Sequence, residues 1–193
     1  MNKPEVIIKS RNNFSIDFNE LWSFRELFYT LAWRDIKVRY KQTGIGVVWA
    51  MVQPFILMVV FTFFFGRVAG IDTGDIPYPI FAYTGFIFWN LFSNSLSAAS
   101  ESLVGNQAMI QKIYFPRVIM PIATVAVFVI DFLFASLVLA ALMVYYNVTP
   151  SILGIILVIP AIGITLLSSA GLGLALASIN VKIILATEDS LIP

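Results

Sequence analysis

Residues 33–49 read WRDIKVRYKQTGIGVVW, and they set a basic cluster directly against an uncharged run. Five charges lie between Arg34 and Lys41, and the next charge along the chain is Arg67. The 25 residues 42–66 exceed the roughly 20 apolar residues that a helix needs to cross the hydrocarbon core of a bilayer. Basic residues gather on the cytoplasmic side of such spans. The stretch therefore predicts a membrane protein whose first span enters from the cytoplasm.

The composition of the whole chain also indicates a protein that lies in a lipid bilayer. Of 193 residues, 59% are hydrophobic and 12% are charged, whereas soluble domains carry roughly 25% charged residues. A water-soluble chain of this length could not hide so much apolar surface. The chain has no cysteine and no histidine, so we expect neither a disulfide nor a metal site nor a histidine relay. The net charge of +1 identifies no partner, and we expect no nucleic acid.

Three further segments are long and poor in charge. The second span is more polar toward its end, so we expect it either to be broken or to line an aqueous path. The sequence predicts an all-α membrane protein with cytoplasmic residues 1–41, four transmembrane helices and a short tail, 183–193. The spans are predicted at about 42–66, 76–100, 118–146 and 151–181.

The basic residues predict the orientation of these spans. With the N-terminus in the cytoplasm, eleven of the 12 basic residues fall inside. Arg67 alone falls outside, and the predicted outer loop 147–150 is uncharged. We therefore predict that residues 101–117 and Lys182 face the cytoplasm.

Residues 21–41 predict an amphipathic helix ahead of the first span. Its apolar residues at helical spacing are Phe24, Leu27, Phe28 and Leu31. Its cations Arg34, Lys37 and Lys41 recur three and four apart. Such a helix lies in the membrane interface. Two interpretations remain open, an anchor that sets topology and a docking surface for a partner.

Three stretches of the chain together carry a family resemblance. They are WRDIKVRYKQTGIGVVWAMVQP at 33–54, NQAMIQKIYFPRVIMP at 106–121, and the stretch that runs from VIDF at Asp131 to GLGLALASINVK. In this order they resemble the permease subunits of type 2 ABC exporters for polysaccharides and polyol phosphates, above all O-antigen exporters. The family's pattern at the first span falls here on Arg34, Asp35, Lys37, Arg39, Tyr40, Lys41, Gly46, Trp49 and Pro54.

The resemblance implies a permease of normally six spans that forms a tunnel with a second copy of itself. It implies separate ATPase subunits on the cytoplasmic face and a lipid-linked polysaccharide or polyol phosphate that moves outward across the bacterial cytoplasmic (inner) membrane. No phosphate-binding G-x-x-x-x-G-K-[ST] motif occurs. We therefore expect ATP and magnesium on the partner ATPase, no cofactor in this chain, and no catalytic residue.

The second span carries the first candidates for a substrate path. Tyr83, Trp89 and Phe92 are expected close to one helix face, where rings can contact the apolar faces of sugars. Asn90 and Asn94 can hydrogen-bond sugar hydroxyls. The alternative is an ordinary interfacial belt with helix–helix contacts.

Asp131 is the one ionisable residue inside a predicted span. Intramembrane acids face a cavity or a partner. No basic residue is expected at similar depth, so we expect this carboxyl to be neutral or paired with backbone and hydroxyl groups. A place in the substrate path and a structural role near the outer leaflet both remain open.

The connection 101–117 is the candidate for ATPase coupling, because a short charged loop can pass a rigid-body push to two spans. Its candidate residues are Glu101, Asn106, Lys112, Phe115 and Arg117. The alternative is a role in topology only.

Two other features complete the expectations. Ser169, Gly173 and Ala177 form a small-residue stripe that predicts close packing of the fourth span on another helix. After Lys182 the sequence IILATEDSLIP departs from the family and is too short to cross a bilayer. We therefore expect a truncated gene product, a fragment, or a second polypeptide that supplies further spans.

Functions of two other classes remain open. A membrane-bound glycan-processing enzyme would need paired acids, and Asp72 and Asp75 are the one close pair predicted outside. An energy-independent channel is the other.

Overall fold

The computed structural model describes residues 22–41, 44–112 and 115–191, and every regular element within them is a helix. The prediction of an all-α protein is confirmed for these residues. The predicted cytoplasmic residues 1–21 lie outside this description. In chain order the elements are α2 (Arg25–Lys41), α3 (Gly44–Phe61), the π-helix η1 (Thr62–Val68), α4 (Tyr78–Gly105), α5 (Gln107–Ile110), α6 (Ile119–Tyr145) and α7 (Ile152–Leu191).

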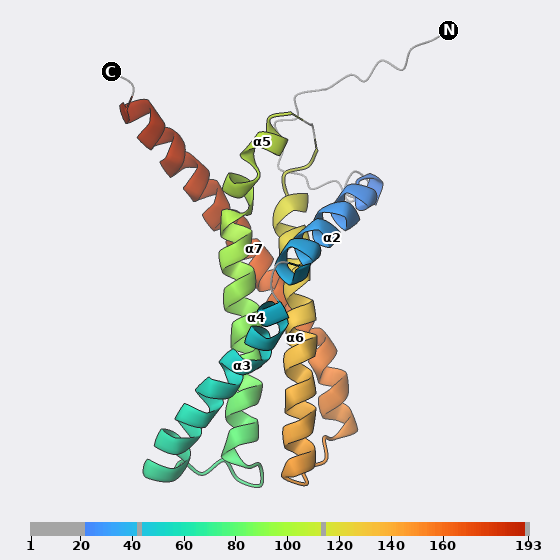
Figure 1. Ribbon diagram of the computed structural model, residues 1–193, viewed down its shortest axis with the longest axis vertical. Coiled ribbons are helices and arrows are strands. Elements are labelled where there is room, and N and C mark those ends of the chain that lie inside the picture. The colour runs from blue at the N-terminus through green and yellow to red at the C-terminus, as the bar shows by residue number, and fades with distance from the viewer. Residues whose placement is uncertain (1–21, 42–43, 113–114, 192–193) are drawn as a thin grey trace.

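The long helices α4, α6 and α7 cross side by side, and α4 contacts both of the others (Figure 1). Helix α2 lies along one half of α6, and α3 runs from its end toward the opposite end of the molecule. The connections η1–α4 and α6–α7 lie at one end, whereas α2 and α5 lie at the other. Successive long helices therefore alternate in direction, as expected of a membrane bundle with short connections.

Three helical segments are long and apolar enough to cross a membrane: Val48–Val68, Ile119–Tyr145 and Ile152–Asn180. The remaining predicted span is α4, which is unbroken over 28 residues, about 42 Å. Of the two alternatives for the second span, the broken helix is therefore wrong, and the lining of an aqueous path stays a prediction. Its polar side chains do not interrupt the helix, because the backbone hydrogen bonds of a helix are internal; Ser95 is buried, whereas Ser97 is exposed.

The crossing of α4 and α7 confirms the small-residue stripe. Ser169 and Ala177 are fully buried, and a Cβ built at Gly173 would overlap the Cβ of Ala99 on α4. The Ala99 Cα would lie 3.5 Å away. The two backbones therefore approach as closely as small residues permit.

Helix α2 forms where the amphipathic pattern predicts it, but its apolar face does not lie on lipid. Leu31 and Ala32 are buried against Phe115 and Met120, and Phe24, Leu27 and Phe28 pack partly buried against the same cluster. The face that remains exposed carries Tyr29 and Trp33. The helix is therefore docked on the protein by the residues that predicted membrane contact.

Helix α7 continues well past the predicted end of the fourth span at residue 181. It runs without interruption to Leu191, 40 residues or about 60 Å. This is about twice the thickness of a hydrocarbon core. The predicted tail 183–193 is thus helical as far as Leu191, and its last turns extend beyond α4 at the end that carries α2 and α5.

Candidate functional site: a polar cavity between α2, α3, α4 and α6

A carboxylate in the middle of α6 is held by two residues from the last turn of α2. The Asp131 Oδ2 lies 2.6 Å from the Arg39 Nη2, and the Asp131 Oδ1 accepts a hydrogen bond of 2.6 Å from the Tyr40 hydroxyl. The Asp131 side chain is 12% exposed and that of Arg39 is 38% exposed. Both carboxylate oxygens are therefore partnered by side chains of the first-span motif.

This contact corrects the expectation that no basic residue lies at the depth of Asp131. Asp131 follows Ile119, the first residue of α6, by about 18 Å of helix. In a helix of 27 residues, that is near the middle. Arg39 reaches Asp131 because α2 packs along α6. The ion pair offsets the cost of a charge inside the bilayer.

The ion pair forms one wall of a small cavity of about 50 Å³. Polar lining comes from Arg39, Gln53, Asn90, Asn94 and Asp131. Apolar lining comes from Trp49, Ala50, Pro54, Ile87, Leu91, Phe128, Phe132 and Ala135. The volume holds no more than a few water molecules. Three predicted path residues thus meet three residues of the first-span motif in one place.

The aromatic candidates on α4 do not share a face. Tyr83 is fully buried, and its hydroxyl donates to the Ala135 carbonyl oxygen at 3.1 Å. Trp89 is 61% exposed and lies against Phe92, with 6.1 Å between ring centroids. Six residues turn a helix by about 240° beyond one full turn, which separates Tyr83 from Trp89. Tyr83 is a core residue, Trp89 faces outward and Phe92 is half-buried beside it.

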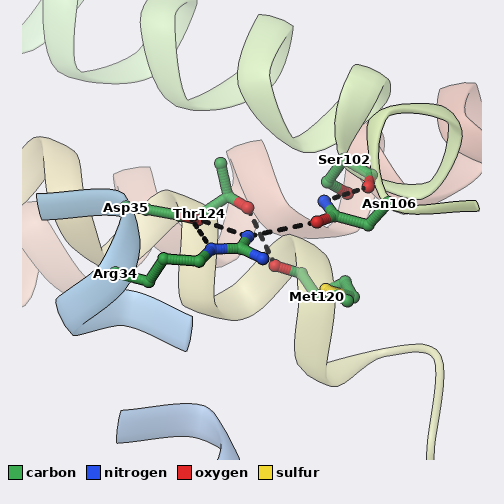
Figure 2. Close-up of polar contacts among 6 residues, drawn as sticks. All are labelled: Arg34, Asp35, Ser102, Asn106, Met120 and Thr124. Atoms are coloured by element: carbon green, nitrogen blue, oxygen red, sulfur yellow. Dashed lines mark hydrogen bonds and ion pairs between the residues drawn. The ribbon is translucent and has the colours of Figure 1, made fainter. Parts of the chain in front are cut away.

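Arg34, another residue of the first-span motif, makes a second contact at the end of α4, shown in Figure 2. The Arg34 Nη2 donates to the Asn106 Oδ1 at 3.1 Å, while the Arg34 Nε donates to the Asp35 Oδ1 at 2.9 Å. The Asn106 Nδ2 donates to the Ser102 carbonyl oxygen at 2.8 Å. Asn106 therefore satisfies the end of α4 and binds α2 with the same amide.

The other predicted coupling residues divide into two groups. Glu101, Lys112 and Arg117 are exposed at the end that carries α2 and α5. Phe115 is buried beneath α2, against Leu31 and the start of α6. The connection thus presents its charges outward while one ring anchors it to the core.

The remaining motif residues line the outside of α2 and the start of α3. Lys37 is exposed, with its Nζ 5.3 Å from the Trp33 ring centroid, and Lys41 is exposed at the end of α2. Gly46 lies in the first turn of α3. Lys37 and Lys41 take part in neither the Arg34–Asn106 contact nor the Arg39–Asp131 contact.

Sequence reasoning missed two polar residues. Gln53 lines the cavity, and its amide directly before Pro54 in an apolar span was a signal for it. Asn180 on α7 donates to the Ser100 carbonyl oxygen on α4 at 3.1 Å. A span-end asparagine carries no such signal by itself, because its partner comes from another helix.

Comparison with known proteins identifies the family. The model of the ABC-2 type transporter family matches residues 26–188. An O-antigen export system permease protein RfbA from Klebsiella pneumoniae is 28% identical over 127 residues, which cover 66% of this chain and 48% of the relative. The protein of the same name from Myxococcus xanthus is 26% identical over 133 residues, 68% of this chain and 50% of the relative. The chain spans about half the length of these curated relatives. It belongs to the ABC-2 type transporter family.

Proposed function

We propose that the chain is a membrane-spanning permease subunit of an ATP-driven exporter of a lipid-linked cell-surface polysaccharide, O-antigen-like, or of a polyol phosphate. The names of its relatives, the family match and the long apolar helices support this function. The observation that carries it is the polar cavity. The residues that join α2 to the membrane interior, Arg39 and Tyr40, are those that carry the resemblance to such exporters.

The polar groups of the cavity are suited to sugars, but its volume is too small for a sugar ring. Its amides, from Gln53, Asn90 and Asn94, donate and accept hydrogen bonds as sugar hydroxyls do. It holds only a few waters as it stands. Passage of a glycan therefore requires α2 and α3 to move from α4 and α6, or a second permease subunit to complete a wider path.

The energy for this movement comes from a separate ATPase subunit that binds ATP and magnesium. Its docking surface on this chain is the end with the exposed Glu101, Lys112 and Arg117. The Arg34–Asn106 hydrogen bond joins that end to α2, and the Arg39–Asp131 pair joins α2 to the cavity. A push on the connection thus reaches the membrane interior through two short polar contacts.

The same end is the cytoplasmic one. The basic residues of α2 and of the 101–117 connection gather there, and cytoplasmic loops carry an excess of Lys and Arg. The permease is placed in the bacterial cytoplasmic (inner) membrane as a multi-pass protein with a cytoplasmic N-terminus. It works as a homodimer and is a transport subunit, not an enzyme.

Co-purification tests this function. The tagged chain is expressed with a candidate ABC ATPase, and the ATPase recovered from membranes is quantified. Replacing Lys112 and Arg117 together by Ala should lower its recovery severalfold while leaving membrane insertion unchanged. Asp75→Asn, an exposed charge at the opposite end, is the matched control. An ATPase that never co-purifies with the intact chain would contradict the proposal.

A further inference from the structure

Arg67 is the one basic residue that the orientation leaves outside, and neither the cavity nor the coupling end explains it. It is the penultimate residue of η1, at the end of the apolar segment Val48–Val68. Its side chain is exposed. Within the part of the chain that the structure describes, no acidic side chain forms an ion pair with it. Among the described residues, this cation at the end of the apolar segment thus has no acidic partner.

This arginine lines a groove between η1, the first turn of α4 and the end of α6, with a volume of about 270 Å³. The apolar walls are Met58, Val59, Phe63 and Pro79. The polar lining is Thr62, Arg67 and Tyr146. No acid is found among the described residues that line it. Apolar walls with a few converging polar groups are typical of ligand sites.

The hydroxyl of Thr62 is the second, independent sign of a ligand. The threonines at 30, 84, 124 and 165 each donate to the carbonyl oxygen four residues earlier in their helices. The Thr62 oxygen is buried in the groove wall and has no hydrogen-bond partner in the described structure. A buried hydroxyl that forgoes the bond its counterparts make lacks a partner, and a ligand in the groove supplies one once the Thr62 side chain rotates toward it.

The π-helix explains why Thr62 and Arg67 share this groove. Residues five apart are separated by about 140° on an α-helix, whereas the hydrogen bonds of a π-helix join residues five apart. The Ala69 N–H accordingly donates to the Phe64 carbonyl oxygen at 2.9 Å. A Cβ at Gly66 would lie 3.2 Å from the Tyr78 ring, so η1 packs tightly on α4. Such π segments frequently occur at functional sites.

We propose that this groove binds the headgroup of an anionic phospholipid of the outer leaflet. The Arg67 guanidinium binds two phosphate oxygens, and the hydroxyls of Thr62 and Tyr146 bind the remaining oxygens of the phosphate or of the glycerol ester. One acyl chain lies along Val59 and Phe63. Both of these are exposed apolar side chains of a membrane-spanning segment, so a lipid fits the groove better than a soluble anion. The choice of leaflet rests on the orientation proposed above, and the site itself does not depend on glycan export.

Photo-crosslinking tests the site in the intact chain. The protein is placed in nanodiscs of phosphatidylcholine with phosphatidylglycerol that carries a photoreactive acyl chain, and crosslinked peptides are mapped. We expect crosslinks concentrated on residues 58–67 and at Tyr146. Arg67→Gln should reduce them roughly tenfold, as the loss of one charge-assisted hydrogen-bonded contact does. Arg67→Lys should reduce them less, because an ammonium keeps the charge but not the fork.

The controls separate this site from general attraction of lipid to cations. Arg117→Gln removes an exposed arginine at the opposite end and should leave the crosslinks at the groove unchanged. Thr62→Val, which keeps the side-chain shape, should reduce them by a smaller factor than Arg67→Gln. Circular dichroism of each variant reports whether the helices still form.

Four outcomes would overturn the proposal. They are equal crosslinking of Arg67→Gln and the unchanged chain, equal yields with photoreactive phosphatidylcholine, displacement of the lipid by inorganic phosphate, and displacement by a soluble oligosaccharide. The assay contains no ATPase and measures no transport. Its failure would therefore leave the exporter proposal standing, and failure of ATPase co-purification would leave the lipid site standing.

Discussion

Arg39 and Asp131 lie 92 positions apart in the sequence, yet their side-chain nitrogen and oxygen meet at 2.6 Å inside the bundle. The Arg39 guanidinium also lies 4.6 Å from the ring centroid of Phe128, one turn of α6 before Asp131. One residue of α2 thus contacts a charge and an aromatic face on the same side of α6. This pair joins the last turn of α2 to the middle of α6.

Breaking this pair should destabilise the protein more than removing an exposed charge. Arg39→Gln leaves the Asp131 carboxylate with a neutral partner, and we expect a loss of about 1.5–3 kcal/mol in the free energy of unfolding. Combining it with Asp131→Asn should cost less than the sum of the single changes. Thermal unfolding in detergent measures this, with Lys37→Gln, an exposed cation of α2, as the control. Strictly additive losses would mean that the two residues do not interact.

The amide of Asn106 should matter for coupling rather than for assembly. Asn106→Ala removes the hydrogen bond from Arg34 and the one to the Ser102 carbonyl oxygen. We expect the ATPase to bind as before but its stimulation by the permease to fall roughly threefold to tenfold, the effect of about one lost hydrogen bond. Gln111→Ala, an exposed amide of the same connection, should leave stimulation unchanged. Stimulation that survives Asn106→Ala would remove α2 from the coupling route.

Three of the spans could be predicted from the sequence because hydropathy is a local property: long apolar runs coincide with segments of α3, α6 and α7. The partner of Asp131 could not be predicted from the sequence, since it comes from a helix whose tilt depends on packing at Leu31 and Phe115. The separation of Tyr83 from Trp89 could have been predicted from the sequence, because the helical angle between positions 83 and 89 excludes a shared face. The burial of Ser95 depends on packing between helices, and the sequence of a single segment does not reveal it.

The crossing of α4 and α7 gives a matched pair of glycine substitutions. Gly173→Ala places a methyl group onto Ala99, and we expect a loss of about 1–3 kcal/mol of stability from overpacking. Gly171→Ala, in open space on the same helix, should instead stabilise the helix by about 0.5–1 kcal/mol. Ala99→Gly should restore much of the stability lost in Gly173→Ala. Equal melting temperatures for the two alanine variants would contradict the close approach.

Single-cysteine labelling tests the orientation without background, because the chain has no cysteine of its own. A membrane-impermeant maleimide applied to intact cells should label Thr73→Cys, which lies in the connection between η1 and α4. Lys112→Cys should react only after the cells are opened. Reaction of Lys112→Cys in intact cells would invert the topology and move Arg67 to the inner leaflet.

The near-contact of backbones at Gly173 and Ala99 restricts how the bundle can deform. Where no side chain separates two helices, their axes can pivot about the crossing point, but they cannot slide past each other without lifting apart. Helices α4 and α7 can therefore rotate relative to each other about this crossing point. From Gly173 the helix α7 continues for about 27 Å to Leu191, so a small rotation at the crossing becomes a displacement of several ångströms at that end of the helix.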